Sequence, residues 1–316
     1  MSHLSVAYHL KVKMKSKLKT SGGMSITKAN ALINAGYRLS LNEMRVIMYG
    51  LSLINPLDEE FPISYEINVS RFAAHFNIDA RERGFYKEMK EAVVSRFWER
   101  DISFWNEELQ RVVKERWLTG VEYSDNKNEI KIYFNPRLRK HLHQLKKNFT
   151  SYFLANVSDM KSIYGVRIYE LCIMQLNIQS KEKTKNTITF ETAIIDLKQR
   201  LMLENKYKIF RDFNSRVLKK AKEEINKHSD IEIDYAVVKK GRSPDKIKFF
   251  AFKKNKTATQ KKKKLSSKQE KKETLRNKIS ELKSFIEGVV CNSDEKLKSQ
   301  TEIELLQLEK ELTAIK

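Results

Sequence analysis

The segment Asn68–Phe76, with the sequence NVSRFAAHF, begins the pattern that decides the fold of this chain. Its polar and apolar residues follow the order of a short helix, and Asn77–Asp79 follows as a turn. A second helix is predicted for Gly84–Trp98, and the β-prone segment Asp101–Trp105 comes after it. This order of helix, turn, helix and strand is typical of a helix-turn-helix with a β-hairpin wing.

The same order of elements recurs about 125 residues further along the chain, as expected of an internal repeat. There Thr189–Leu197 is predicted to open the helix-turn-helix and Glu204–Lys206 to turn, with Tyr207–His228 as the second helix. Ile231–Tyr235 and Lys246–Phe250 are predicted as strands of the second wing. We therefore expect an α+β protein of two tandem winged-helix domains, an arrangement that places two recognition helices in the grooves of one DNA site.

Composition favours a nucleic acid partner. The chain has 62 Lys and Arg against 40 Asp and Glu, which gives a formal net charge of +22 and a pI near 9.7. A charge of this size attracts a polyanion, because each cation that neutralises a phosphate releases a counterion. A lysine-rich proteome encoded by an AT-rich genome is the alternative explanation for the excess.

Cysteine content and hydropathy set further limits. The two cysteines, Cys172 and Cys291, are too few and too far apart for a disulfide framework or a zinc site. A reducing, cytoplasmic environment is therefore expected, with no metal and no cofactor. No apolar run approaches the roughly 18 residues of a transmembrane helix, so no membrane partner is expected.

The chain is expected to divide into four parts. Residues 1–24 lack the apolar run of a signal peptide and are predicted as a basic flexible arm, within which Met24 is a candidate natural start. Residues 25–147 and 148–255 are predicted as the two winged-helix domains. Residues 256–316 are predicted as a helical C-terminal extension, with a lysine-rich linker before two apolar heptad stripes. A helical hairpin and a coiled-coil contact with a partner explain these stripes equally well.

The second helix of the second domain has one apolar face. At 100° per residue, the residues on that face are predicted to enter the core. They are Phe210, Phe213, Val217, Ala221 and Ile225.

The opposite face of this helix is cationic. Such a face is usually only solvated surface, but its position between a helix-turn and a basic wing favours DNA. Residues near the helix N-terminus are expected to meet base edges, and those further along to meet phosphates. The expected base-reading residues are Lys208, Arg211 and Ser215; the other expected contacts are Arg216 at the edge of the face, Lys219, Lys222 and the wing residues Lys239, Lys240 and Arg242.

The equivalent helix of the first domain has a weaker cationic face, because Glu88 and Glu91 lie among its cations. We expect this helix to position the DNA backbone more than to read bases. Its predicted contacts are Arg81, Arg83, Lys87 and Lys90.

Several motifs occur in order between residues 25 and 253. They are KANALI at 28–33, LSLNEMR at 39–45, FTSY at 149–152, SIYGVRIYEL at 162–171, and DFNSRVL at 212–218 with EIN at 224–226. Together they resemble the theta-replicating plasmid initiators of the Rep_3 type, the iteron-binding Rep proteins. The resemblance implies that a monomer binds directly repeated iterons in a plasmid origin and that a dimer represses the rep promoter.

We therefore expect a plasmid initiator that binds double-stranded DNA, nucleates origin opening, and recruits a host initiator and the replicative helicase. A homodimer is expected in equilibrium with the monomer, and the protein is expected to associate with the nucleoid or the plasmid. Two departures from the family stand out. Asn214–Arg216 replace the usual Lys-Arg-Arg or similar, and residues after Lys256 lie outside the family core.

One motif favours an enzyme instead. His141-Leu142-His143 matches the His-hydrophobic-His signature of rolling-circle nickases, in which two histidines on a strand bind a metal. Here Arg137–Leu145 is predicted as a helix, which turns the two rings about 200° apart. We therefore expect satisfied surface histidines and no enzymatic activity. A winged-helix transcriptional repressor without a replication role is the remaining alternative.

Overall fold

The computed structural model of the chain describes residues 23–79, 89, 96–97, 100–106, 109–124, 128–179 and 187–254, together with residues 279, 305, 306 and 309. The chain separates into two compact units, residues 1–254 and 255–316. The predicted basic arm, most of the predicted helix at 84–98 and most of the predicted tail lie outside the described residues. Within those residues, no helix has the length and hydropathy that crossing a membrane requires.

The first half of the larger unit alternates short helices with short strands. Its elements are β1 (Ser25–Ala29), α2 (Asn30–Asn34), β2 (Gly36–Tyr37), α3 (Leu41–Leu53), β3 (Tyr65–Asn68), α4 (Val69–His75), β4 (Asp101–Asn106), β5 (Arg111–Arg116), β6 (Leu118–Ser124), β7 (Glu129–Phe134), η3 (Pro136–Leu138) and α6 (Arg139–Leu142). The predicted helix at 68–76 and the predicted strand at 101–105 are confirmed as α4 and β4.

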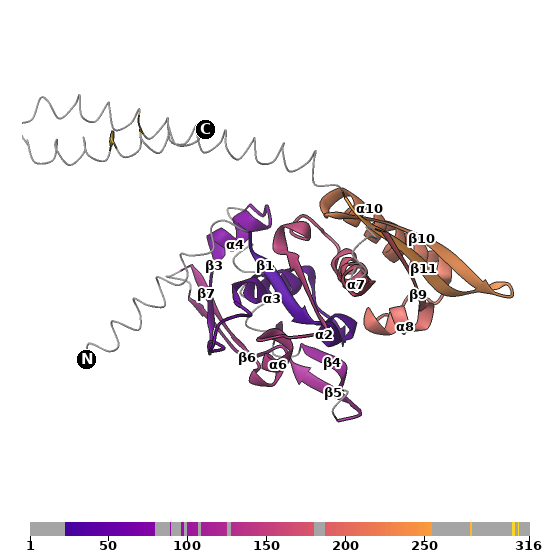
Figure 1. Cartoon of the computed structure of the whole chain (residues 1–316), viewed down its shortest axis with the longest axis horizontal. Coiled ribbons are helices and arrows are strands. Elements are labelled where there is room, and N and C mark those ends of the chain that lie inside the picture. The colour runs from indigo at the N-terminus through magenta and orange to yellow at the C-terminus, as the bar shows by residue number, and fades with distance from the viewer. Residues whose placement is uncertain are drawn as a thin grey trace, which may run out of the picture. The chain divides into compact units, whose positions relative to one another are not determined.

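The second half of this unit contains one long buried helix and one long hairpin. Its elements are β8 (Phe149–Phe153), η4 (Leu154–Asn156), α7 (Ile163–Gln179), β9 (Thr187–Ala193), α8 (Ile194–Arg200), α9 (Phe210–Phe213), η5 (Asn214–Lys219), α10 (Lys220–His228), β10 (Ile231–Lys240) and β11 (Ser243–Lys253). The hairpin of β10 and β11 extends past α8 (Figure 1).

Antiparallel pairing organises the strands into small sheets, with the orders β2-β4-β5, β3-β7-β6, β1-β8 and β10-β11-β9. The β1-β8 pair sets Ile26 opposite Tyr152. Because β8 begins at Phe149, the first strand of the predicted second domain pairs with the first strand of the predicted first domain. The division after residue 147 therefore remains a proposal about folding units.

Helix α3 shows how local sequence sets an element boundary. The Ser40 hydroxyl accepts from the Glu43 amide at 3.3 Å, and the Glu43 carboxylate accepts from the Ser40 amide at 2.7 Å. This capping box satisfies amides that the first helical turn leaves free. The helix therefore begins at Leu41, directly after this cap. The same carboxylate is held by both ends of the Arg100 guanidinium, at 2.9 and 3.0 Å.

The predicted opening helix of the second helix-turn-helix, Thr189–Leu197, is wrong at its beginning. Residues 187–193 form strand β9, and only Ile194 begins helix α8. The reason is the run TITFET at 187–192, which is rich in β-branched residues that favour an extended strand. Because β9 pairs with β11 along its whole length, the sheet supplies hydrogen bonds that a lone helix end would lack.

A buried charge cluster ties the two halves of this unit together. The Lys28 ammonium lies 2.6 Å from the Glu170 carboxylate, and the Arg167 guanidinium lies 3.6 Å from its other oxygen. All three side chains are at most 4% exposed. Arg167 also donates to the carbonyls of Ala35 at 2.6 Å and Arg200 at 3.1 Å, at the C-terminal ends of α2 and α8. Partial negative charge at these carbonyls offsets the second cation.

Glu224 links the recognition helix of the second domain to α7. Its carboxylate accepts from the amides of Lys161 and Ser162, at 3.0 and 3.1 Å, just before α7 begins. Gly165 leaves room for this contact, because a Cβ there would lie 2.5 Å from a Glu224 oxygen. Burial raises the pKa of Glu224 even though these amides oppose the shift. The glycine in the SIYGVRIYEL motif therefore has a packing role.

Candidate nucleic-acid interface

The predicted recognition helix of the second domain is continuous from Phe210 to His228, through α9, η5 and α10. It begins three residues after the predicted start at Tyr207, which has a left-handed backbone (φ 52°) and cannot continue a helix. The apolar face is confirmed, since four of its five residues are fully buried and Phe210 packs against the same core. The fully buried members are Phe213, Val217, Ala221 and Ile225.

The outward face of this helix carries the predicted cations. Lys208, Arg211, Ser215, Arg216 and Lys219 are all exposed. Residues 214–219 form a π-helical turn, which holds more residues than an α-helical turn and changes the phase of the residues after it. Lys220, which the 100° periodicity did not select, is also exposed.

Lys222 has a different environment from the one predicted. Its ammonium is 2.6 Å from the Asp234 carboxylate on strand β10, and its side chain is 37% exposed. This hydrogen bond lowers the pKa of Asp234, so the carboxylate is charged at neutral pH. Lys222 therefore joins the recognition helix to the wing. Arg211, by contrast, is 85% exposed, and the carboxylate of the neighbouring Asp212 lies farther away from it, at 3.9 Å.

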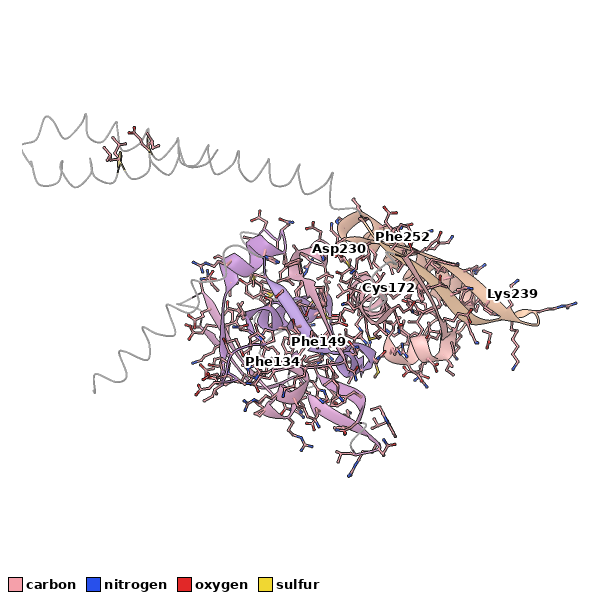
Figure 2. All side chains as sticks on the ribbon, in the orientation of Figure 1. Phe134, Phe149, Cys172, Asp230, Lys239 and Phe252 are labelled. Carbon is pink, nitrogen blue, oxygen red and sulfur yellow. The ribbon has the colours of Figure 1, made fainter. Side chains whose placement is uncertain are left out.

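The second wing is the hairpin of β10 and β11, whose two-residue turn places Gly241 at φ 63°. Glycine adopts this left-handed backbone without steric cost, and no atom within 4 Å would obstruct a side chain there. Lys239, Lys240 and Arg242 are exposed around this turn, and Figure 2 labels Lys239 near the hairpin tip.

A hydrogen bond fixes the base of this wing against the helix. The Tyr235 hydroxyl donates to the Asn214 side-chain oxygen at 2.7 Å. Asn214 is one of the residues that departs from the family pattern. In this chain it orients the wing strand rather than presenting a cation to DNA.

The predicted contacts of the first domain, Arg81, Arg83, Lys87 and Lys90, lie outside the described residues. Strands β4 and β5 of the neighbouring hairpin are described, and Arg111, Lys114 and Arg116 are exposed on β5. Lys114 is paired with Asp101 at 2.8 Å. These wing cations were not among the predicted contacts, although the RVVKER segment at 111–116 comes shortly after the predicted strand at 101–105.

A second basic surface lies in the connection between β7 and β8. Its pocket, of about 560 Å³, is lined by Pro136, Arg137, Arg139, Lys140, His143 and Gln144. Arg137 is paired with Glu115 at 2.6 Å. The repeated cations of RLRKHLHQLKK were a signal for this surface, which the prediction treated only as a connecting helix.

The two histidine rings pack against different aromatic side chains. Helix α6 ends at Leu142 rather than Leu145, and His143 is extended, so the predicted helix is too long. The His141 ring packs edge-on against Phe104 at 4.8 Å, whereas the His143 ring packs against Phe61 at 5.6 Å. The prediction of satisfied surface histidines is wrong for His143. This residue is 4% exposed, and neither ring nitrogen has a hydrogen-bond partner among the described residues.

Comparison with known proteins agrees with this geometry. Residues 25–173 match the family described as initiator replication protein, WH1, and residues 193–250 match initiator Rep protein, WH2. An Escherichia coli replication initiation protein is 28% identical over 229 residues, which cover 71% of this chain and 68% of that protein. An uncharacterized 27.6 kDa protein of Escherichia coli is 22% identical over 230 residues, covering 69% and 92%.

The fold also matches a solved structure, that of the Pi initiator protein in complex with iteron DNA. The TM-score is 0.61 at 21% sequence identity, and the match covers 75% of this chain and all of that one. The two family matches show that the helix-turn-helix units and their hairpins are two winged-helix domains. The chain therefore belongs to the Rep family of replication initiators, which are DNA-binding proteins rather than enzymes.

Proposed function

We propose that this chain is a plasmid replication initiator that binds directly repeated iterons as double-stranded DNA. The observation that carries the proposal is the exposed cationic face at the start of the second recognition helix, next to an exposed basic wing. Membership of the initiator family supports it. The structural likeness to the Pi initiator, which was solved in complex with iteron DNA, also supports the proposal.

Within this interface the residues have different roles. Lys208, Arg211 and Ser215 lie at the leading end of the helix, where winged-helix proteins contact base edges. Phosphates are the proposed partners of Arg216, Lys219, Lys239, Lys240 and Arg242, because cations further along the helix and on a wing meet the backbone. Lys222 positions the wing through Asp234, and its predicted phosphate contact requires that ion pair to open.

The first domain is proposed to hold the DNA backbone through Arg81, Arg83, Lys87 and Lys90. Its β4-β5 wing adds the exposed cations Arg111 and Arg116 to the same task. Two tandem recognition units on one site neutralise more phosphates than one unit does. They should therefore bind more tightly at a given salt concentration.

Beyond binding, we propose that the monomer nucleates origin opening and recruits a host initiator and the replicative helicase. A dimer in equilibrium with it represses the rep promoter. The family assignment supports these roles, and the proposal is that the protein acts in the cytoplasm, on the nucleoid or the plasmid.

A selection experiment tests the proposal directly. The full-length chain is used to select tight-binding duplexes from a random pool, and the selected sequence is compared with the DNA beside the gene. We expect a match to several direct repeats next to an AT-rich stretch, and local strand opening there on a supercoiled plasmid. A match to one inverted repeat over the promoter, without opening, would instead identify a repressor, and a pool without any preferred sequence would exclude both.

A further inference from the structure

Ile209 occupies an unusual position at the start of the recognition helix. Its side chain is 60% exposed although it is large and apolar. It is also the N-cap residue, and the helix start has no side-chain capping hydrogen bond. Serine, threonine, aspartate and asparagine stabilise an N-cap, whereas isoleucine is among the poorest choices. Stability of the free protein therefore does not account for isoleucine at this position.

The backbone holds Ile209 in one place. Its carbonyl accepts from the amides of Asp212 and Phe213, at 3.1 and 3.4 Å, and its backbone is extended (φ −88°, ψ 127°). Phe210 and Phe213, which follow it, pack against the core. Ile209 thus presents an exposed apolar side chain from a fixed backbone position at the start of the helix.

Exposed cations flank this apolar side chain. Lys208 precedes it and Arg211 follows two residues later, and both are exposed. Cations at this end of a recognition helix draw it into the major groove, where residues of the first turn reach base edges. The major groove displays one apolar group, the C5-methyl of thymine.

We propose that Ile209 is a specificity-determining residue that packs against the C5-methyl group of a thymine in the cognate duplex. The inference rests on the proposed function, because it requires that this helix enter the major groove of a specific site. It predicts a preference for thymine over cytosine at one position, at which a hydrogen bond from Lys208 or Arg211 is not required.

Another exposed isoleucine provides a matched comparison. Ile195 on α8 is 67% exposed, close to the value for Ile209. Its neighbour Asp196 is exposed and anionic, so this part of α8 does not attract a phosphate backbone. Ile195→Ala therefore removes the same side chain from a surface that we do not expect to meet bases.

The test combines a change in the protein with a change in the DNA. Thymines of the selected duplex are replaced one at a time by deoxyuridine, which removes only the methyl group. For the unmodified chain one such replacement is expected to weaken binding about fourfold, because burial of one methyl group contributes ~0.8 kcal/mol. With Ile209→Ala the same replacement should change affinity less than about twofold, while Ile195→Ala keeps the full effect.

A second variant separates reading from folding. Ile209→Ser supplies a capping oxygen and removes the apolar surface, so the free protein should melt at a higher temperature while it binds the selected duplex more weakly. Lower stability together with weaker binding would indicate a structural role and would overturn the inference. The inference would also be overturned if no single deoxyuridine replacement changed the affinity of the unmodified chain, while that chain still preferred the selected duplex to a scrambled one. Loss of that discrimination would overturn the proposed function, and this inference with it.

Discussion

At Glu170, one buried carboxylate faces two buried cations, Lys28 and Arg167. The Tyr152 hydroxyl donates to the same carboxylate, and burial beside Glu170 raises the pKa of that hydroxyl well above its usual range, so it stays protonated. The cluster therefore carries one positive charge in excess. Among the described residues, the carbonyls at the ends of α2 and α8 offset it, together with the Tyr37 ring, whose centroid lies 3.9 Å from the Arg167 guanidinium carbon.

This imbalance predicts unequal costs for two similar substitutions. Glu170→Gln leaves two buried cations without a counterion and should lower the free energy of unfolding by about 3–5 kcal/mol. Lys28→Met leaves Arg167 and Glu170 as a matched pair and should cost less. Urea denaturation of the full chain measures both, and a larger loss for Lys28→Met would contradict this reading of the cluster.

His75 gives the stability of the first domain a dependence on pH. Burial lowers the pKa of its ring, partly opposed by Asp159, and the Ser158 hydroxyl lies 3.0 Å from Nε2. The unfolded chain therefore binds a proton at this site at higher pH than the folded chain does. The contribution is fully present above the unfolded pKa of 6.5 and is lost as pH falls from there to the lower folded pKa.

Accordingly, the free energy of unfolding should fall between about pH 7.5 and pH 5.5, and His75→Gln should remove part of that fall. Urea titrations at the two pH values, on both proteins, measure the difference. His228, which lies 3.9 Å from Asp159, is present in both proteins. An identical fall in the two proteins would exclude a contribution from His75.

At the scale of elements, the second recognition helix is proposed to carry residues that read bases in its first turn and residues that bind phosphates further along. Arg211 lies in its first turn and is 85% exposed, whereas Lys219 lies at the end of the π-helical turn. Arg211→Ala should cost about 1–3 kcal/mol on the selected duplex and little on a scrambled one, whereas Lys219→Ala should weaken both alike. Competition binding on the two duplexes distinguishes these patterns. Equal losses on both duplexes for Arg211→Ala would mean that another face of the helix reads the bases.

The element scale also shows what periodicity does and does not predict. The apolar face from Phe213 to Ile225 was predicted correctly, because core packing repeats along one helix. The role of Lys222 was missed, since its partner Asp234 lies on a strand and helical periodicity carries no information about cross-element pairs. The burial of His143 was missed for the same reason, because Phe61 comes from a distant loop.

Elements were mistaken where a local pattern fits two structures. The segment at 189–193 was predicted as helix because it stands where 68–76 stands in the first unit, but pairing with β11 makes it a strand. The order of helix, turn, helix and wing was still correct, since it depends on the sequence of elements rather than on their exact ends. The function followed from motifs of the initiator family more than from any single residue.

At the scale of the whole molecule, the winged-helix unit ends with Lys254. Its ammonium donates to the carbonyls of Asn226 and of Ser229, the latter at 3.0 Å, at the end of the recognition helix. The chain separates into its two compact units directly after this residue. Lys254 therefore belongs to the DNA-binding unit and not to the lysine-rich segment that follows.

A chain that ends at residue 255 should thus fold and still prefer the selected duplex. It should bind every duplex more weakly, because it lacks the lysine-rich segment that follows. Adding Lys254→Ala to that shortened chain should lower the free energy of unfolding by about 1 kcal/mol, because the last carbonyls of the helix lose a cation. Thermal denaturation and competition binding test the two statements. Loss of sequence preference in the shortened chain would place part of the specificity beyond residue 255.

The central claim is that basic surfaces on two winged-helix domains hold one duplex while a recognition helix selects its sequence. Equilibrium binding of the full chain to the selected and scrambled duplexes, over a salt series, tests it most directly. If roughly 6–10 phosphates are neutralised, both affinities should fall steeply, for the selected duplex by about 10³–10⁵-fold between 50 and 200 mM salt, while the selected duplex stays preferred. A flat salt dependence, or equal affinity for both duplexes throughout, would contradict the claim.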